Sequence, residues 1–281
     1  MTTTRDSSAF LSAASVPLEE LTRIWNAAYE GYFVPLAFTP DLMARHLDRA
    51  GVDLELSCVL ALDEGNVGLS LSARRGDLGY LAGFGIARVA RRKGWARLLL
   101  RNQIANWRDA GLFQVQLEVI EENPARQLYA QGGFVMQRLL QAYEGKVEAG
   151  AGLPELVTLD EAALAQAHSR LNAGLRPTWR REFPSLAKAL HIEGVRTLGI
   201  EVHGDVTAYA VVQPAGARLA ILDAAAYSAA DARLLLQALA ARSPGMALRL
   251  VDEPEGTALS HAASALMGRV LRQVEMVRAT A

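Results

Sequence analysis

The chain has 281 residues, 51% of them hydrophobic, and a formal net charge of −1 at pH 7. This composition supports one large or two small hydrophobic cores, and the balanced charge gives no general attraction to nucleic acid or acidic membranes. The single cysteine, Cys58, excludes an intramolecular disulfide and is typical of a reducing cytosol, so we expect a cytoplasmic protein. Cys58 lies in an apolar run over 54–62, which predicts a buried, inert thiol.

The N-terminal stretch 1–8 is polar and lacks the apolar core of a signal peptide. No apolar run approaches the length that spans a membrane. We therefore expect neither a membrane nor a nucleic-acid partner.

The first half of the chain predicts alternating helices and strands. In chain order we expect helices over 18–30 and 40–50, a hairpin of 56–62 and 67–73, a strand over 79–86, a helix over 96–107, a strand over 113–120, a helix over 125–131 and a strand over 134–143. The hairpin turns at 63–66, whose sequence is Asp-Glu-Gly-Asn.

A short basic loop with one glycine joins the strand over 79–86 to the next helix. Residues 91–96 read Arg-Arg-Lys-Gly-Trp-Ala. Backbone N–H groups at a helix N-terminus are unpaired and the helix dipole favours an anion there, while glycine lets the backbone fold around a phosphate. The loop matches neither the Walker nor the dinucleotide-binding glycine pattern. Alone, it fits a pyrophosphate nest or, more commonly, a solvated surface turn.

A second informative segment follows the strand over 113–120. Asn123 and Pro124 are a favourable helix start, and Gly132 with Gly133 is a favourable helix end. Tyr129 lies on this short helix. Its pattern alone fits a core residue with its hydroxyl at the rim.

Together the two segments resemble the GCN5-related N-acetyltransferase (GNAT) family. The first family signature, [RQ]-x-x-G-x-[GA] after a strand, fits residues 91–96. The second, A-x-x-L-Y-x-x-x-G-F, is matched at every fixed position by 125–134. The family usually has an Asn seven residues before the Tyr, where this chain has Glu122, and Asn123 is one step closer. The resemblance covers roughly residues 15–147.

The resemblance implies transfer of an acetyl group from acetyl-CoA, as co-substrate, to a primary amine that attacks the thioester directly. It implies a bulged strand that splays from its neighbour, presents backbone groups to the pantetheine arm and offers an N–H to the thioester carbonyl. The loop amides and cations would meet the phosphates, and Tyr129 matches the general acid for the leaving thiolate. The expected cofactor-binding residues are Phe84, Gly85, Ile86, Arg91, Arg92, Lys93, Gly94, Trp95, Ala96, Arg97, Asn123 and Tyr129.

The acceptor ammonium must lose a proton before it attacks. Glu118 is our candidate base, because it is one of the polar residues that alternate with apolar ones along its strand, beside the expected cleft. The alternative is that Glu118 forms an ion pair with an arginine. Glu30 is a weaker candidate. Glu30, Tyr32 and Phe33 are the expected acceptor-side residues, with Tyr29 in the same aromatic wall, although these aromatics would equally pack the first helix pair.

Residues 145–156 have the composition of a linker, and the same order of elements then returns. We expect helices over 160–171 and 185–191, a hairpin of 198–201 and 207–212, a strand over 219–223, a helix over 231–241, a strand over 247–251, a helix over 257–266 and a strand to 278. The predicted fold is therefore α/β, with two GNAT-like domains over 1–147 and 148–281, each a mixed, mostly antiparallel sheet flanked by helices.

The second copy lacks the expected chemistry. In the register of the repeat, Tyr227 replaces Arg91 and Asp231 replaces Trp95, so a carboxylate stands where phosphates would bind. We expect this copy to be degenerate, and we expect the basic turn over 179–181 to be solvated.

The histidines show no metal-ligand spacing, and no metal is expected. The acceptor would be a small-molecule or peptide amine, and the oligomeric state stays open. Two alternatives remain: a coenzyme A-binding sensor or scaffold without turnover, and a transferase of another acyl group.

Overall fold

The computed structural model describes residues 8–34 and 36–280. The polar stretch over 1–7 and Pro35, in the aromatic loop, lie outside the described residues. The described chain forms two compact units. Unit 1 contains the residues up to Gln137 together with those from Met276 onward, and unit 2 is Arg138–Glu275.

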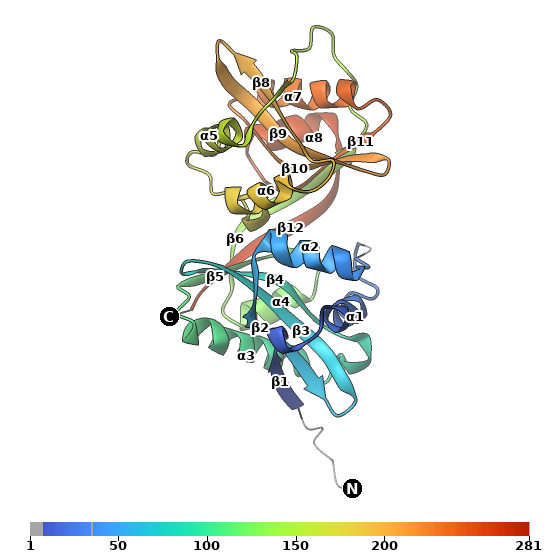
Figure 1. Ribbon diagram of the computed structural model, residues 1–281, viewed down its shortest axis with the longest axis vertical. Helices are drawn as coiled ribbons and strands as arrows, with labels where there is room; N and C mark the ends of the chain where they lie inside the picture. The colour runs from blue at the N-terminus through green and yellow to red at the C-terminus, as the bar shows by residue number, and fades with distance from the viewer. Residues whose placement is uncertain (1–7, 35, 281) are drawn as a thin grey trace. The chain divides into compact units, whose positions relative to one another are not determined.

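The strands and helices of unit 1 follow the predicted order (Figure 1). They are β1 (Ser8–Ser12), α1 (Leu18–Ala28), α2 (Pro40–Ala50), β2 (Val52–Leu62), β3 (Gly65–Arg75), β4 (Leu78–Ile86), α3 (Trp95–Asp109), β5 (Gln114–Ile120), α4 (Ala125–Gln131) and β6 (Val135–Gly145), which continues into unit 2. Every predicted helix and strand of this half is present. Only the five-residue β1 has no predicted counterpart.

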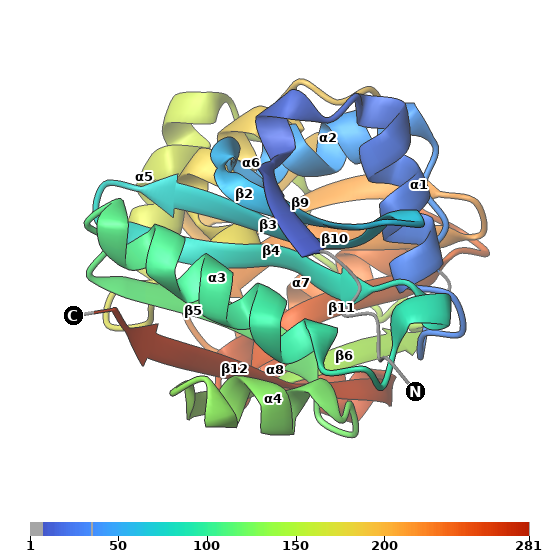
Figure 2. The ribbon, with the colours of Figure 1, turned by 90° about the horizontal axis from the view of Figure 1, so that it is seen from below.

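The sheet of unit 1 has the strand order β1-β2-β3-β4-β5. Its pairs are antiparallel except β4 with β5, which run parallel. Helices α1 and α2 cover one face of the sheet, and α3 lies along the other (Figure 2). On the α3 face, the fully buried Trp107 donates from its indole N–H to the hydroxyl of Ser72 at 2.9 Å.

Unit 2 repeats this plan. Its elements are β7 (Val157–Thr158), α5 (Glu161–Leu171), α6 (Phe183–Leu190), β8 (Arg196–Val202), β9 (Asp205–Ala215), β10 (Arg218–Ala226), α7 (Ala229–Arg242), β11 (Ala247–Pro254), α8 (Ala258–Leu266) and β12 (Gly268–Ala279), which ends in unit 1. The strand order is β6-β11-β10-β9-β8-β7, and only β10 with β11 is parallel among the pairs resolved there. The prediction of two α/β units with mixed, mostly antiparallel sheets is confirmed.

The division into compact units differs from the sequence-based domain boundary at 147/148. It falls inside β6, and the last described residues return to unit 1. There the N–H of Thr280 donates to the carbonyl of Phe113 at 3.1 Å. The C-terminal end of the chain thus completes the unit that contains the N-terminal half.

None of the helices in the described part of the chain is both long enough and apolar enough to cross a membrane.

Candidate active site

The parallel strands β4 and β5 separate halfway along their length. They pair only from Leu78 with Gln114 to Tyr80 with Gln116, and beyond this point no pairing joins them. The register of β4 against β3 shifts between Leu81 and Gly83, which leaves Ala82 as a bulge. A bulge bends its strand and increases the local twist, and here it coincides with the splay. The expected bulged and splayed strand is present.

The backbone groups beyond the bulge alternate between β3 and the open side. Ala87 donates its N–H to Val67 on β3 at 2.7 Å, so the groups of Gly85 also face β3. Those of Phe84 and Ile86 then face the gap between β4 and β5. Gly85 serves packing, because a Cβ there would lie 2.8 Å from the Cβ of Ala28 on α1.

The loop after β4 folds as an N–H-lined turn at the start of α3. Gly94 is the N-cap, with a left-handed φ of +85°, and nothing lies within 4 Å of a Cβ built on it. Glycine is therefore required by the backbone conformation rather than by lack of space. Within the described residues, the N–H groups of 92–96 bond no acceptor. The turn has the free donors and dipole position that suit a phosphate.

The cations of this loop have different environments. Arg92 and Lys93 are exposed, and Arg97 is exposed with one Nη donating to Gln131. The guanidinium of Arg91 turns back instead. It donates to the carbonyl of Ile86 at 3.0 Å and to that of Ala28 at 2.8 Å, and so ties the end of β4 to the end of α1.

Trp95 and Ala96 begin α3 and pack half-buried against a hydrophobic cluster. The cluster contains Cys58, which is 2% exposed and whose thiol pKa is raised to about 11 by burial. The prediction of a buried thiol is confirmed.

Tyr129 lies on α4 beside the open side of β4. Its side chain is 6% exposed, and its ring makes edge contacts with Phe84 and Phe134, each at 5.9 Å between centroids. Burial, and then the nearby phenols of Tyr29 and Tyr32, raise its pKa well above the ordinary value near 10. Tyr129 therefore stays a neutral hydrogen-bond donor at physiological pH.

The loop after α1 brings the predicted acceptor-side residues to the same end of the sheet. The hydroxyl of Tyr32 accepts from Nδ2 of Asn123 at 3.3 Å, and burial raises its pKa. The Oδ1 of Asn123 also accepts from the N–H of Ala125, the first residue of α4, at 2.9 Å, while the N-cap itself is Pro124. Phe33 is 52% exposed beside Tyr32, and Glu30 forms an exposed ion pair with Arg88 at 3.3 Å.

Glu118 lies on β5, two residues past the last pair of β5 with β4. Its Oε2 accepts from the hydroxyl of Tyr80 at 2.6 Å, and Tyr80 is the last paired residue of β4. The carboxylate thus stands where the two strands separate. Sequence reasoning identified Glu118 but not its tyrosine partner.

No protein-family model and no curated protein sequence matches this chain. Among solved structures, a GCN5-related N-acetyltransferase from Sphaerobacter thermophilus matches with a TM-score of 0.69 at 17% identity, over 99% of this chain and 96% of that chain. A tandem GNAT protein from the clavulanic acid biosynthesis pathway matches at 0.68 and 13%, over 98% and 99%. A GCN5-related N-acetyltransferase from Anabaena variabilis matches at 0.67 and 13%, over 98% and 73%.

The chain has the tandem GNAT fold. At these identities the likeness concerns the fold alone, and the chemistry has to be argued from this chain's own residues.

The second GNAT unit has the same splayed pair of strands. β10 pairs with β11 only from Arg218 to Ile221, and β10 carries its bulge at Leu222. Tyr227 donates its N–H to Thr207, as Ala87 does to Val67. Tyr227 is therefore the counterpart of Ala87, and the expected replacement of Arg91 by Tyr227 is wrong, because the connection after β10 is shorter than that after β4. By this correspondence Asp223 is the counterpart of Gly83 and Ala224 that of Phe84.

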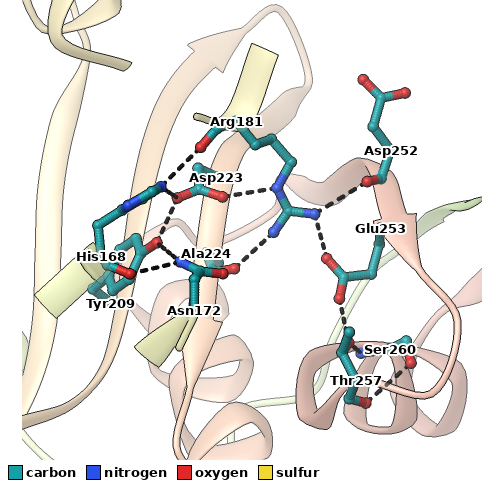
Figure 3. A network of polar contacts seen from close by, with 10 residues as sticks. All are labelled: His168, Asn172, Arg181, Tyr209, Asp223, Ala224, Asp252, Glu253, Thr257 and Ser260. Atoms are coloured by element: carbon teal, nitrogen blue, oxygen red, sulfur yellow. Dashed lines mark hydrogen bonds and ion pairs between the residues drawn. The ribbon is translucent and has the colours of Figure 1, made fainter. Parts of the chain in front are cut away.

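Arg181 is a buried arginine within a network of polar contacts in unit 2 (Figure 3). It forms part of the wall of a cavity beside the splayed strands, which Tyr227 and Thr257 also line. Arg181 donates from Nε to Asp223 at 2.7 Å, from Nη1 to Glu253, and from Nη2 to the carbonyl of Ala224 at 2.7 Å. Burial alone would lower the pKa of the guanidinium, but Glu253 and Asp223 more than offset this and raise it. The hydroxyl of Tyr209 donates to the other oxygen of Asp223 at 2.6 Å.

The expectation of a solvated turn over 179–181 is wrong. Trp179 is 0% exposed and Arg181 is 6% exposed. Arg180, at the edge of the network, donates to the carboxylate of Asp252 at 2.8 Å. The basic residues are held inside by acids that come from two distant strands.

The turn that precedes α3 has no counterpart before α7 in unit 2. Residues 87–94 connect β4 to α3, whereas only 227 and 228 connect β10 to α7. Ser228 caps α7 by accepting from the N–H of Asp231 at 3.1 Å, and its hydroxyl bonds the carboxylate of Asp231 at 2.5 Å. The helix start is therefore satisfied internally and carries a negative charge.

Among the described residues, no group of three or more His, Cys, Asp or Glu side chains could hold a metal ion.

Proposed function

We propose that unit 1 is an acetyl-CoA-dependent N-acetyltransferase that transfers the acetyl group to a primary amine of a small molecule or peptide. The observation that carries this proposal is that the open edge of β4 is followed directly by a turn whose backbone N–H groups bond no acceptor. The open backbone of β4 leads directly into the turn at Gly94, so one extended ligand with an amide-containing arm and a pyrophosphate fits both.

Different residues of unit 1 would bind different parts of acetyl-CoA. The N–H groups of 92–96 would hold the pyrophosphate, with the exposed side chains of Arg92 and Lys93 available to its charges. The carbonyl of Phe84 and the N–H of Ile86 face the gap and would pair with the pantetheine amides, whereas the carbonyl of Ile86 is already bonded by Arg91. Arg91 would act by holding β4 and α1 together, since its guanidinium already bonds two carbonyls.

The acetyl thioester supplies an activated acyl group. The N–H of Phe84 would donate to its carbonyl oxygen and stabilise the negative charge that develops there, a contribution of about 3 kcal/mol for a well-placed donor. Tyr129, kept neutral by burial, would donate its hydroxyl proton or a hydrogen bond to the departing sulfur. Glu118 would accept the proton of the incoming ammonium, with Tyr80 orienting its carboxylate.

The acceptor side of this proposal is the loop over 29–33. Its aromatic side chains and Glu30 suit an amine carried on an apolar body. Unit 2 would bind no coenzyme A, because Arg181 already bonds the carbonyl of Ala224, the counterpart of Phe84, and Asp231 places a carboxylate at the start of α7.

The proposal is tested by calorimetric titration of acetyl-CoA into the wild-type protein and into Gly94→Asp. Aspartate at this position adds a negative charge to the turn and strains a left-handed residue. Gly76→Asp is the matched control, because Gly76 also has a left-handed φ and open space but lies in the hairpin between β3 and β4. We expect one acetyl-CoA per chain, lost in Gly94→Asp and kept in Gly76→Asp.

No binding to the wild-type protein, or equal binding by both variants, would refute the proposal. Titration with several acyl-CoA thioesters separates acetyl transfer from transfer of another acyl group. Binding without turnover on any amine in a broad acceptor screen would favour a coenzyme A sensor or scaffold.

A further inference from the structure

The N–H that the proposed function assigns to the thioester carbonyl already has a partner in this structure. Phe84 donates its N–H to the hydroxyl oxygen of Tyr29 at 3.4 Å. This contact joins the open side of β4 to the residue that ends α1. A phenol oxygen, like a thioester carbonyl oxygen, is a neutral acceptor, so the two can occupy the same donor in turn.

Tyr29 is positioned from both sides. Its ring lies 4.3 Å from that of Trp25 and 5.1 Å from that of Tyr32, measured between centroids. Arg91 fixes the end of the helix by its bond to the carbonyl of Ala28, the residue before Tyr29. The phenol is therefore directed at Phe84 by packing and by a backbone anchor.

The bond itself is weak. Its length exceeds the common range of about 2.7–3.2 Å for N–H···O hydrogen bonds. The equivalent position in unit 2 differs. The carbonyl of Ala224, the counterpart of Phe84, accepts from the guanidinium of Arg181 at 2.7 Å within a buried ion network. In unit 2 a fixed charge bonds the carbonyl of this strand position, whereas in unit 1 a neutral hydroxyl accepts from the N–H at a longer distance.

We propose that Tyr29 is a positioning residue that occupies the Phe84 N–H until acetyl-CoA binds, and that the thioester carbonyl displaces its hydroxyl. This inference rests on the proposed function of unit 1. No covalent bond changes; the N–H exchanges one oxygen acceptor for another. Because Tyr29 packs against Tyr32, the displacement reaches the loop that carries the acceptor-side residues.

The test compares acetyl-CoA with free coenzyme A, which has the same pantetheine arm and phosphates but no acetyl carbonyl. Calorimetry is performed on the wild-type protein, on Tyr29→Phe and on the control Tyr143→Phe, which removes a buried phenol from unit 2. Removing the competing hydroxyl should tighten acetyl-CoA binding by roughly two- to tenfold and change coenzyme A binding by less than about twofold. Tyr143→Phe should leave the ratio of the two affinities at its wild-type value.

A ratio that is unchanged or lower in Tyr29→Phe would overturn the inference, because a merely structural tyrosine would affect both ligands alike. The same holds if Tyr143→Phe raises the ratio as much as Tyr29→Phe. Wild-type protein that binds neither ligand would overturn the proposed function and this inference together. Binding of both ligands with an unaltered ratio would overturn only the inference.

Discussion

Replacing Arg181 by methionine should destabilise unit 2 by about 3–5 kcal/mol, the usual cost of removing one partner from a buried ion pair. The guanidinium bonds two carboxylates that are almost inaccessible, those of Asp223 at 1% and Glu253 at 2% exposure. Methionine retains much of the apolar stem, so the loss comes mainly from the uncompensated charges and the unbonded carbonyl of Ala224.

Native-state hydrogen exchange followed by mass spectrometry measures this effect unit by unit. Core amides of β9 and β10, which exchange by opening of the whole unit, should exchange roughly 10²- to 10⁴-fold faster in the variant. The amides of β2 and β3 in unit 1 provide an internal reference.

Arg170→Met is the matched control. Arg170 also belongs to unit 2 and pairs with Asp205, but both side chains are exposed, at 47% and 73%, and such pairs are worth less than about 1 kcal/mol. Removing all three charges of the network together, with Arg181→Met, Asp223→Asn and Glu253→Gln, should restore most of the stability. An Arg181→Met variant within about 1 kcal/mol of the wild type would refute the account of the network.

Four further outcomes are expected, and they concern Tyr129, Glu118 and Cys58. Tyr129→Phe should lower turnover by about 10²- to 10⁴-fold while calorimetry shows unchanged acetyl-CoA affinity; unchanged turnover would remove Tyr129 from the mechanism. Because the pKa of Tyr129 is raised well above 10, loss of its proton should cause no fall in wild-type turnover below about pH 10. Glu118→Gln should lower turnover by about 10²-fold or more and abolish its rise with pH on the acid side, and a retained acid limb would assign the base elsewhere. The thiol of Cys58, with a pKa raised from 9.0 to about 11, favours folding below pH 9 and loses that contribution as pH rises toward 11. At pH 8, iodoacetamide should therefore label it far more slowly in native protein than in urea; equal rates would contradict its burial.

The elements that could be predicted have local signals at both ends. For α2, Thr39 caps the first turn by accepting from the N–H of Leu42, and Gly51 ends the helix with φ +70°. These signals depend on neighbours in the chain, which the sequence displays directly. The strand β1 could not be found in this way, because four of the five residues of Ser8–Ser12 are exposed and no apolar face repeats along it.

Contacts with the backbone were invisible to sequence reasoning. Arg91 fits the basic phosphate loop by its place in the motif, yet its guanidinium bonds the carbonyls of Ile86 and Ala28. Every residue has a backbone carbonyl, so a hydrogen bond to a carbonyl cannot be predicted from the pattern of side chains. The same reason hid the contact of Tyr29 with the N–H of Phe84.

The Arg181 network was missed for a different reason. A basic turn is usually solvated, and its partners Asp223 and Glu253 lie 42 and 72 residues further along the chain. One signal was present: Asp223 lies between apolar residues in a predicted strand, where an unpaired carboxylate would be costly. An acid in such a position requires a buried cation, and Arg181 provides it.

The residue that follows the bulge, Gly83 on β4 and Asp223 on β10, is therefore a position at which the two units differ in chemistry. In unit 1 a Cβ at Gly83 would lie 2.4 Å from the ring of Trp25, so glycine lets α1 cover the bulged strand with an aromatic residue. In unit 2 the counterpart, Asp223, carries a charge that needs a cation inside the cleft. Arg181, which pairs with this carboxylate, also donates to the backbone carbonyl of Ala224. We infer that the acid at 223 requires a buried cation beside the splayed strands of unit 2, whereas the glycine at 83 admits the neutral ring of Trp25 against the bulged strand of unit 1.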